Sequence, residues 1–240
     1  MQDFEFLVSI DGAVARVDLN RPDEGNALTR PMMVQLAGVI RDLGARADTR
    51  VIVLQARGSE FCRGRDGRGE SNQGLSPHDI RVKAMGAVLG VYDAIQAVPI
   101  PVVALVQGPA VGFGAALAGA SDITLASDAA RFSFTEIKHG IPPTMAMAAV
   151  LRNVPAKALT YLIYSAQEVS ASEAVAFGLA SRVLPRAGFE KEAEAFVSEL
   201  AGRPRLVLET IKKFQQHATG LPAPMVSEYA GTLLALVRSS

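Results

Sequence analysis

Residues 102–120 read Val102-Val103-Ala104-Leu105-Val106-Gln107-Gly108-Pro109-Ala110-Val111-Gly112-Phe113-Gly114-Ala115-Ala116-Leu117-Ala118-Gly119-Ala120. The first five are all apolar, which is typical of a strand covered on both faces. Residues 108–114 then predict a glycine-rich turn, and the small residues from 112 to 120 predict a helix. A turn that opens a helix leaves main-chain N–H groups unpaired, at the end where the helix dipole favours negative charge.

A second strand and turn of this kind occur earlier in the chain. The apolar run 51–54 predicts a buried strand, and Phe61-Cys62-Arg63-Gly64-Arg65-Asp66-Gly67 follows it. If the two strands are neighbours, one N–H donor from each turn can point at the same oxygen, which is the arrangement of an oxyanion hole. The spacing alone leaves open the alternative that two glycine turns simply pack closely.

The remaining pattern predicts strands alternating with helices first and helices alone afterwards. Residues 4–10 and 13–20 predict a hairpin with a type I′ turn at Asp11-Gly12. Helices are predicted after Thr29, after Ser76-Pro77 and after the capping-box pair Ser170 and Glu173, and then over 189–200, 205–217 and 225–237. We therefore expect an α/β fold, with a core over residues 1–185 and a helical C-terminal region over 186–240.

The composition excludes several classes of protein. With 240 residues, 49% hydrophobic and 20% charged, the chain fits neither a disordered nor a fibrous protein. Lys plus Arg equals Asp plus Glu, 24 each, which argues against a nucleic-acid partner. Cys62 is the single cysteine, and the acidic stretch 1–5 has no secretory pattern, so we expect a cytoplasmic protein.

One uncharged stretch needs a separate explanation. Residues 94–121 carry no charge and are long enough to cross a bilayer. They nevertheless contain three prolines and four glycines, which fit a helix end, a strand, a loop and a second helix better. We therefore expect no membrane span.

Glu136 is the strongest candidate for acid–base chemistry. It lies between apolar residues at the end of an extended segment, where burial raises the pKa of a carboxyl towards that of a general base. The alternative is a solvated charge paired with Lys138. None of the three histidines has metal-ligand spacing, so no metal is expected. A helix face with Lys212 and Lys213 is either simply solvated or holds phosphates.

Taken in order, these segments resemble the crotonase (enoyl-CoA hydratase/isomerase) superfamily. The resemblance covers residues 5–235 and rests on these stretches: Asn20-Arg21-Pro22, Asn26-Ala27-Leu28, 50–54, 61–66, 108–114, Ser121-Asp122-Ile123, Phe134-Thr135-Glu136 and 170–185. It implies a crotonase-like spiral of ββα units with a helical C-terminal oligomerisation region, assembled as a homotrimer or homohexamer. It also implies an acyl-CoA thioester substrate, with no cofactor beyond the CoA moiety.

The resemblance assigns roles to individual residues. The two oxyanion N–H donors fall on Arg65 and Phe113, although glycine is usual at the second position. The general base falls on Glu136. The residues that match the CoA-binding region are Glu24, Ala27, Arg63, Arg65, Asp66, Gly67, Arg68 and Gly112, and Lys212 matches a lysine near the CoA phosphates. The three arginines suit contacts to phosphate groups.

The chain departs from the family pattern at the acid–base pair. Hydratases of the family use two glutamates, and the first of these falls on Ala116; Thr144, where some relatives carry an aspartate, is likewise no acid. A single carboxylate suffices to move a proton from C2 to C4 of an enoyl thioester, whereas addition of water generally uses two. The sequence therefore favours an enoyl-CoA isomerase. The alternatives are an enoyl-CoA hydratase, another enolate chemistry, or a CoA-thioester-binding protein without turnover.

Overall fold

The computed structural model describes residues 5–239, so Phe4, the predicted start of the first strand, lies outside it. The strands are β1 (Phe6–Asp11), β2 (Val14–Leu19), β3 (Val51–Ala56), β4 (Val102–Val106), β5 (Pro109–Val111), β6 (Ile123–Ser127), β7 (Arg131–Ser133), β8 (Val169–Ser170) and β9 (Arg182–Leu184). The α-helices are α1 (Arg30–Ala45), α2 (Pro77–Asp79), α3 (Gly86–Ala97), α4 (Phe113–Ala120), α5 (Thr144–Val150), α6 (Ala156–Ser165), α7 (Ala171–Ala176), α8 (Phe189–Ala201), α9 (Arg205–Ala218) and α10 (Ala223–Ser239). Two 3-10 helices, η1 (Pro22–Glu24) and η3 (Glu136–His139), and a π-helical segment, η2 (Ile80–Met85), complete the elements.

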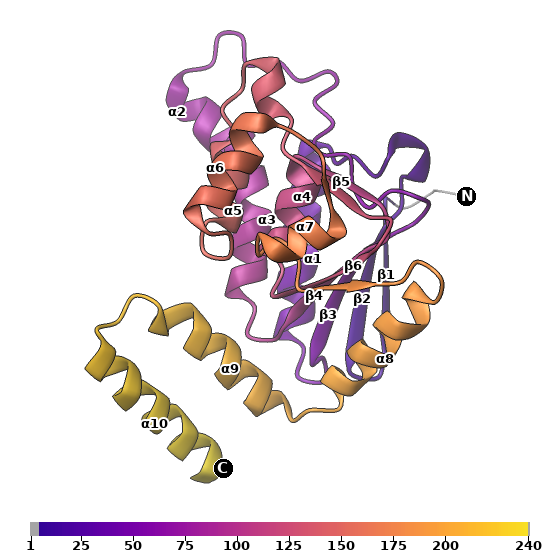
Figure 1. Cartoon of the computed structure of the whole chain (residues 1–240). Coiled ribbons are helices and arrows are strands. Elements are labelled where there is room, and N and C mark those ends of the chain that lie inside the picture. The colour runs from indigo at the N-terminus through magenta and orange to yellow at the C-terminus, as the bar shows by residue number, and fades with distance from the viewer. Residues whose placement is uncertain (1–4, 240) are drawn as a thin grey trace.

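A six-stranded sheet with the order β1-β2-β3-β4-β6-β9 forms the centre of the molecule (Figure 1). From β2 to β9 the strands are parallel, and both faces of the sheet are covered. Ile52 and Leu54 belong to the hydrophobic cluster that includes α1, α3 and α4, whereas Val51 and Val53 pack with α8. This two-sided burial explains why β3 is apolar without alternation.

A second sheet, with the order β5-β7-β8, contains the short second strands of the ββα units. Long strand β4 is followed by short strand β5 and helix α4, and β6 is followed in the same way by β7 and, after η3, by α5. β5 pairs in parallel with β7, so successive units stack in the same orientation. The predicted ββα architecture is confirmed.

The local turn and capping signals are confirmed in most places. Thr29 and Ser170 each cap a helix through the side-chain oxygen, and Ser76 accepts from the Asp79 N–H at 3.1 Å. The predicted hairpin turn is wrong by one residue: Gly12 and Ala13 form the loop, and only Gly12 has positive φ, at 54°. A type I′ turn needs positive φ at both central residues, so that turn type is excluded.

The C-terminal helices do not all stand apart from the sheet. Phe189, Ala193 and Val197 of α8 share a hydrophobic cluster with β3, β4 and β6, so α8 covers one face of the sheet. α10 packs on α9, and Figure 1 shows this pair extending away from the α/β body. Among residues 5–239, no helix combines the length and the apolar character needed to cross a bilayer.

Candidate active site

The segments that follow β3 and β4 hydrogen-bond to each other. The Val111 N–H donates to the Cys62 carbonyl at 2.9 Å, and the Cys62 N–H donates to the Pro109 carbonyl at 3.2 Å. A parallel bridge also joins Arg65, in the segment after β3, to Leu28, which precedes α1. Because β3 and β4 are parallel neighbours, both segments leave the same edge of the sheet. The two predicted turns therefore meet.

Two glycines make this close approach possible. A Cβ at Gly114 would lie 2.1 Å from the Cys62 carbonyl oxygen, so a larger residue would push the two turns apart. Gly112 has φ +54°, and a Cβ there would lie 3.0 Å from Oε1 of Glu136. Glycine at 112 thus serves both the backbone conformation and the approach of a carboxylate.

The meeting turns leave two main-chain donors unused. Within residues 5–239, neither the Arg65 N–H nor the Phe113 N–H donates a hydrogen bond. Their neighbours do: the Gly112 N–H donates to the Ser133 carbonyl at 2.8 Å, and the Asp66 N–H donates to the Leu28 carbonyl at 2.8 Å. Phe113 is the first residue of α4, where N–H groups have no intrahelical acceptor.

Glu136 starts η3, directly after the extended segment of β7, and its side chain is half-buried. Its Oε2 is buried and has no hydrogen-bond partner among the described residues. Burial raises the pKa of this carboxyl above its usual value, although main-chain hydrogen bonding and the charge of His139 oppose the rise. A raised pKa suits a general base that works near neutral pH.

A cavity of about 410 Å³ joins these groups. The lining residues are Arg63, Gly64, Arg65, Gly67, Val88, Tyr92, Val111, Gly112, Phe113, Thr135, Glu136, His139, Ile141, Pro142, Pro143, Met145 and Ala146. Both unused donors, the half-buried carboxylate and an apolar wall therefore surround a single space. This combination is typical of a small-molecule site.

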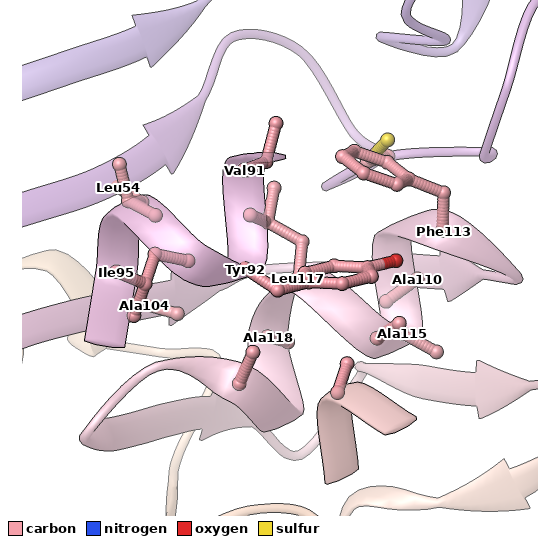
Figure 2. Packing of buried hydrophobic residues seen from close by; sticks show 14 of the residues in the cluster. Leu54, Val91, Tyr92, Ile95, Ala104, Ala110, Phe113, Ala115, Leu117 and Ala118 are labelled. Atoms are coloured by element: carbon pink, nitrogen blue, oxygen red, sulfur yellow. The ribbon is translucent and has the colours of Figure 1, made fainter. Parts of the chain in front are cut away.

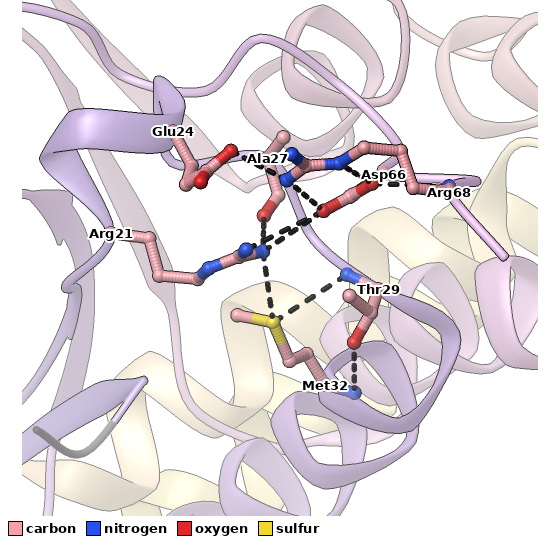
Figure 3. Close-up of polar contacts among 7 residues, drawn as sticks. All are labelled: Arg21, Glu24, Ala27, Thr29, Met32, Asp66 and Arg68. Atoms are coloured by element: carbon pink, nitrogen blue, oxygen red, sulfur yellow. Dashed lines mark hydrogen bonds and ion pairs between the residues drawn. The ribbon is translucent and has the colours of Figure 1, made fainter. Parts of the chain in front are cut away.

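Beside the cavity, a polar network joins four of the predicted CoA-binding residues (Figure 3). Arg68 Nη2 lies 2.5 Å from Glu24 Oε2 and 2.8 Å from Asp66 Oδ2. Arg21 donates to the Ala27 carbonyl at 2.7 Å and lies 3.4 Å from Asp66. The hydrogen bonds from Arg68 hold the pKa of Asp66 well below its usual range. The network fixes the loop between β3 and α2 against η1 and the start of α1.

The other two loop arginines also have carboxylate partners. Arg63 lies 2.5 Å from Glu60, and Arg65 lies 2.9 Å from Glu70, which also binds Arg30 at 2.8 Å. Arg63 and Arg65 line the cavity as well. Ion pairs at exposed guanidinium groups contribute only about 0–1 kcal/mol each, so a phosphate can replace such a partner at low cost.

Lys212 is the one predicted binding residue that the structure contradicts. Its side chain is only 5% exposed, and its ammonium donates to the Ile95 and Ile100 carbonyls and to Asp122 at 2.7–3.0 Å. These three acceptors use all three N–H bonds. Lys212 lines a different hollow, which shares no lining residue with the cavity at Glu136. It therefore anchors α9 and has no donor left for a phosphate.

The positions that lack an acid in the sequence lack one in the site as well. Ala116 is fully buried within α4 and lies outside the lining of the cavity, and Thr144 is exposed at the start of α5.

Burial raises the pKa of the Cys62 thiol to about 12, which excludes a thiolate nucleophile near neutral pH. No group of three His, Cys, Asp or Glu side chains in the described part of the chain is arranged for a metal.

Sequence reasoning missed Tyr92, which lines the cavity from α3. It lies one turn after Val88 on the buried face of that helix, and its hydroxyl is buried without a partner among residues 5–239. The available signal was a lone tyrosine on an otherwise aliphatic helix face. That signal is weak, because such a tyrosine usually reaches the surface or a partner with its hydroxyl.

Comparisons with known proteins show which family the sequence and the fold resemble. The sequence profile of the family described as enoyl-CoA hydratase/isomerase matches residues 9–235. Two similar proteins carry enoyl-CoA hydratase as a provisional name. One, from Thermus thermophilus, is 34% identical over 199 residues, which cover 79% of this chain and 75% of that protein. The other, from Rhodobacter capsulatus, is 31% identical over 222 residues, which cover 92% and 84%.

A solved structure gives the same result in three dimensions. The crystal structure of an enoyl-CoA hydratase from Mycobacterium smegmatis superposes with a TM-score of 0.89 at 30% sequence identity, covering 97% of this chain and 90% of that one. The likeness thus includes the strands, the two turns and the C-terminal helices.

Proposed function

Since the chain belongs to the enoyl-CoA hydratase/isomerase family, we propose that it moves a proton on an enoyl-CoA thioester, with Glu136 as the single carboxylate base. The supporting observation is that one cavity is lined by the half-buried Glu136 and by Arg65 and Phe113, whose main-chain N–H groups are unused. The absence of an acid at Ala116 favours isomerisation of a 3-enoyl to a 2-enoyl thioester as the reaction that Glu136 performs alone.

The proposed steps use only these groups. The thioester carbonyl oxygen accepts the N–H bonds of Arg65 and Phe113, which act as an oxyanion hole. Ionised Glu136 takes a proton from C2, the negative charge moves to the carbonyl oxygen, and the same carboxyl returns the proton at C4. Each main-chain donor of this kind lowers a barrier by about 2.7–4 kcal/mol.

The CoA moiety lies, in this proposal, along the loop after β3. Arg63, Arg65 and Arg68 exchange their carboxylate partners for CoA phosphates, while the main chain near Gly67 and Gly112 and the groups at Glu24, Ala27 and Asp66 border the pantetheine and adenine. The protein needs no cofactor beyond the CoA of its substrate.

Glu136→Gln tests the proposal. The variant keeps the shape of the side chain but cannot accept the proton, so we expect kcat on 3-enoyl-CoA to fall by about 10²–10⁴-fold. Thioester affinity should stay within about threefold, because the role is in the transition state. Glu5→Gln, at an exposed position outside the cavity, is the matched control.

Two results would contradict the proposal. Turnover that survives in Glu136→Gln would mean that Glu136 is not the base. Tight thioester binding by the wild-type protein without turnover of any enoyl-CoA would instead favour a binding protein.

A further inference from the structure

Two of the residues that line the cavity each carry a buried polar atom without a partner. In the described part of the chain, four buried side-chain polar atoms lack a hydrogen-bond partner, and two of them are Oη of Tyr92 and Oε2 of Glu136. Both residues line the cavity, and the other two, Arg30 and Thr49, do not. Leaving a buried polar atom unpaired costs about 1–3 kcal/mol, so two in one cavity point to a ligand that pairs them.

Packing fixes the ring of Tyr92. The ring stacks on Phe113 with a centroid distance of 5.7 Å and an interplanar angle of 26°. Figure 2 shows the hydroxyl on the side of Ala115, away from Ile95, so it does not point into the aliphatic core around Ile95. Tyr92 is only 3% exposed, and it is one of the residues that line the cavity.

The two unpartnered oxygens are chemically complementary. Burial raises the pKa of Tyr92 well above its usual value, and the charge of Glu136 raises it further, so the phenol stays protonated and donates. Glu136 must be ionised to act as a base, so it accepts. No hydrogen bond joins Tyr92 directly to Glu136. A water molecule completes such a pair, because its oxygen accepts from the phenol while one of its hydrogens is donated to the carboxylate.

We propose that Tyr92 is the second polar group of the reacting centre, and that with Glu136 it holds the water that adds to C3 of a 2-enoyl thioester. This inference rests on the proposed function, since it uses the same base and the same two N–H donors. It assigns the protein a hydration activity in addition to isomerisation. Tyr92 then takes part in a site in which α4 has Ala116, which is no acid.

The addition balances without any further reactant. Glu136 takes a proton from the water, the water oxygen bonds to C3, and the π electrons of C2=C3 move to the thioester carbonyl oxygen. The Glu136 carboxyl then returns the proton to C2, so that H and OH have been added and the carboxylate is restored. Tyr92 keeps its own proton throughout and only donates a hydrogen bond to the water oxygen.

Tyr92→Phe is the direct test, because phenylalanine keeps the ring and its stacking but removes the hydroxyl. We expect kcat/KM for hydration of 2-enoyl-CoA to fall about 10–100-fold, the effect of one hydrogen bond on a barrier. Isomerisation of 3-enoyl-CoA, and exchange of the C2 protons of a saturated acyl-CoA in D₂O, should change by less than about threefold. Tyr161→Phe, at an exposed tyrosine of α6 outside the cavity, is the matched control.

The outcomes separate this inference from the proposed function. Equal losses of hydration and exchange in Tyr92→Phe would mean that the residue only supports the cavity, and unchanged hydration would mean that it holds no water; either result overturns the inference. Isomerisation without any hydration by the wild-type protein overturns it too, while the proposed function stands. A wild-type protein inactive in all three assays overturns both.

Discussion

At the residue scale, the site depends on polar groups that the fold leaves incompletely paired. Glu136 keeps a buried oxygen without a partner, and Arg65 and Phe113 keep unused N–H groups, in a protein whose other arginines and carboxylates near the cavity are paired. Unpaired groups destabilise the free protein and become useful only when a ligand binds them. This gives a stability test of the assignment of Glu136.

The stability of the Glu136→Gln variant should depend on pH in a defined direction. Burial raises the pKa of Glu136 in the folded protein, so the folded state is penalised once this carboxyl ionises. The penalty is absent below the ordinary glutamate pKa and complete above the raised one. Thermal unfolding should therefore give Glu136→Gln a Tm advantage over wild type near pH 8 that disappears as the pH falls below about 4.

Glu5→Gln removes the same charge at an exposed position and serves as the control. If it gives the same pH-dependent difference in Tm, the effect comes from net charge and not from burial of Glu136. A Tm for Glu136→Gln below that of wild type at pH 8 would also contradict the assignment.

At the scale of elements, helix α9 is held to the body by buried polar contacts. The Lys212 ammonium reaches two carbonyls at the end of α3 and the carboxylate of Asp122, which precedes β6. Arg205, at the start of α9, donates to the carbonyl of Gly44 in the last turn of α1 and to those of Arg46 and Thr49 after it. Two basic residues thus tie α9 to loops that lie far from it in the sequence.

Lys212→Met should loosen this attachment. The change leaves Asp122 without its counter-charge and two carbonyls without a donor. Breaking a fully buried pair costs about 3–5 kcal/mol, but the Asp122 side chain is 26% exposed and remains partly hydrated, so we expect a loss of about 1–3 kcal/mol. Urea unfolding measures the loss.

Lys213→Met is the natural control, because Lys213 is exposed on the same helix. If the two variants are equally stable, Lys212 contributes nothing to the attachment of α9. If Lys212→Met specifically weakens CoA binding without loss of stability, Lys212 binds CoA and does not anchor α9.

At the scale of the whole molecule, the α9–α10 pair leaves apolar surface uncovered. Leu233 is buried against its neighbours, but Leu234 and Leu236 are 60% and 59% exposed. Ile211 and Met225 on the same two helices are also exposed. Apolar residues gathered on one extended part of a molecule commonly mark an interface between chains.

We therefore expect a homotrimer or homohexamer, measured as molar mass by light scattering. Leu234→Glu combined with Leu236→Glu should shift the mass towards that of the monomer, because the charges would be buried in the interface. Val34→Glu, at an equally exposed apolar residue of α1, should leave the mass unchanged. A monomeric wild-type protein would contradict this expectation directly.

The sequence by itself determined the elements and most of their ends, because these depend on neighbours along the chain. The apolar run of β4, the caps at Thr29 and Ser170 and the two glycine turns could all be read locally. The order of the motifs was enough to identify the family and to select Glu136, Arg65 and Phe113. The position of the hairpin turn was missed by one residue, since Asp11-Gly12 and Gly12-Ala13 are both compatible with the flanking strands.

Only the tertiary structure decided which polar groups have partners. Lys212 reads as a surface lysine of an amphipathic helix, yet it is buried because Asp122 and two carbonyls come from elements far away in the sequence. Tyr92 reads as a core aromatic residue, yet it lines the same cavity as Glu136, because its ring stacks on Phe113 at the turn that follows β5. Whether a polar atom is paired depends on atoms that the fold brings to it, and no local pattern in the sequence records them.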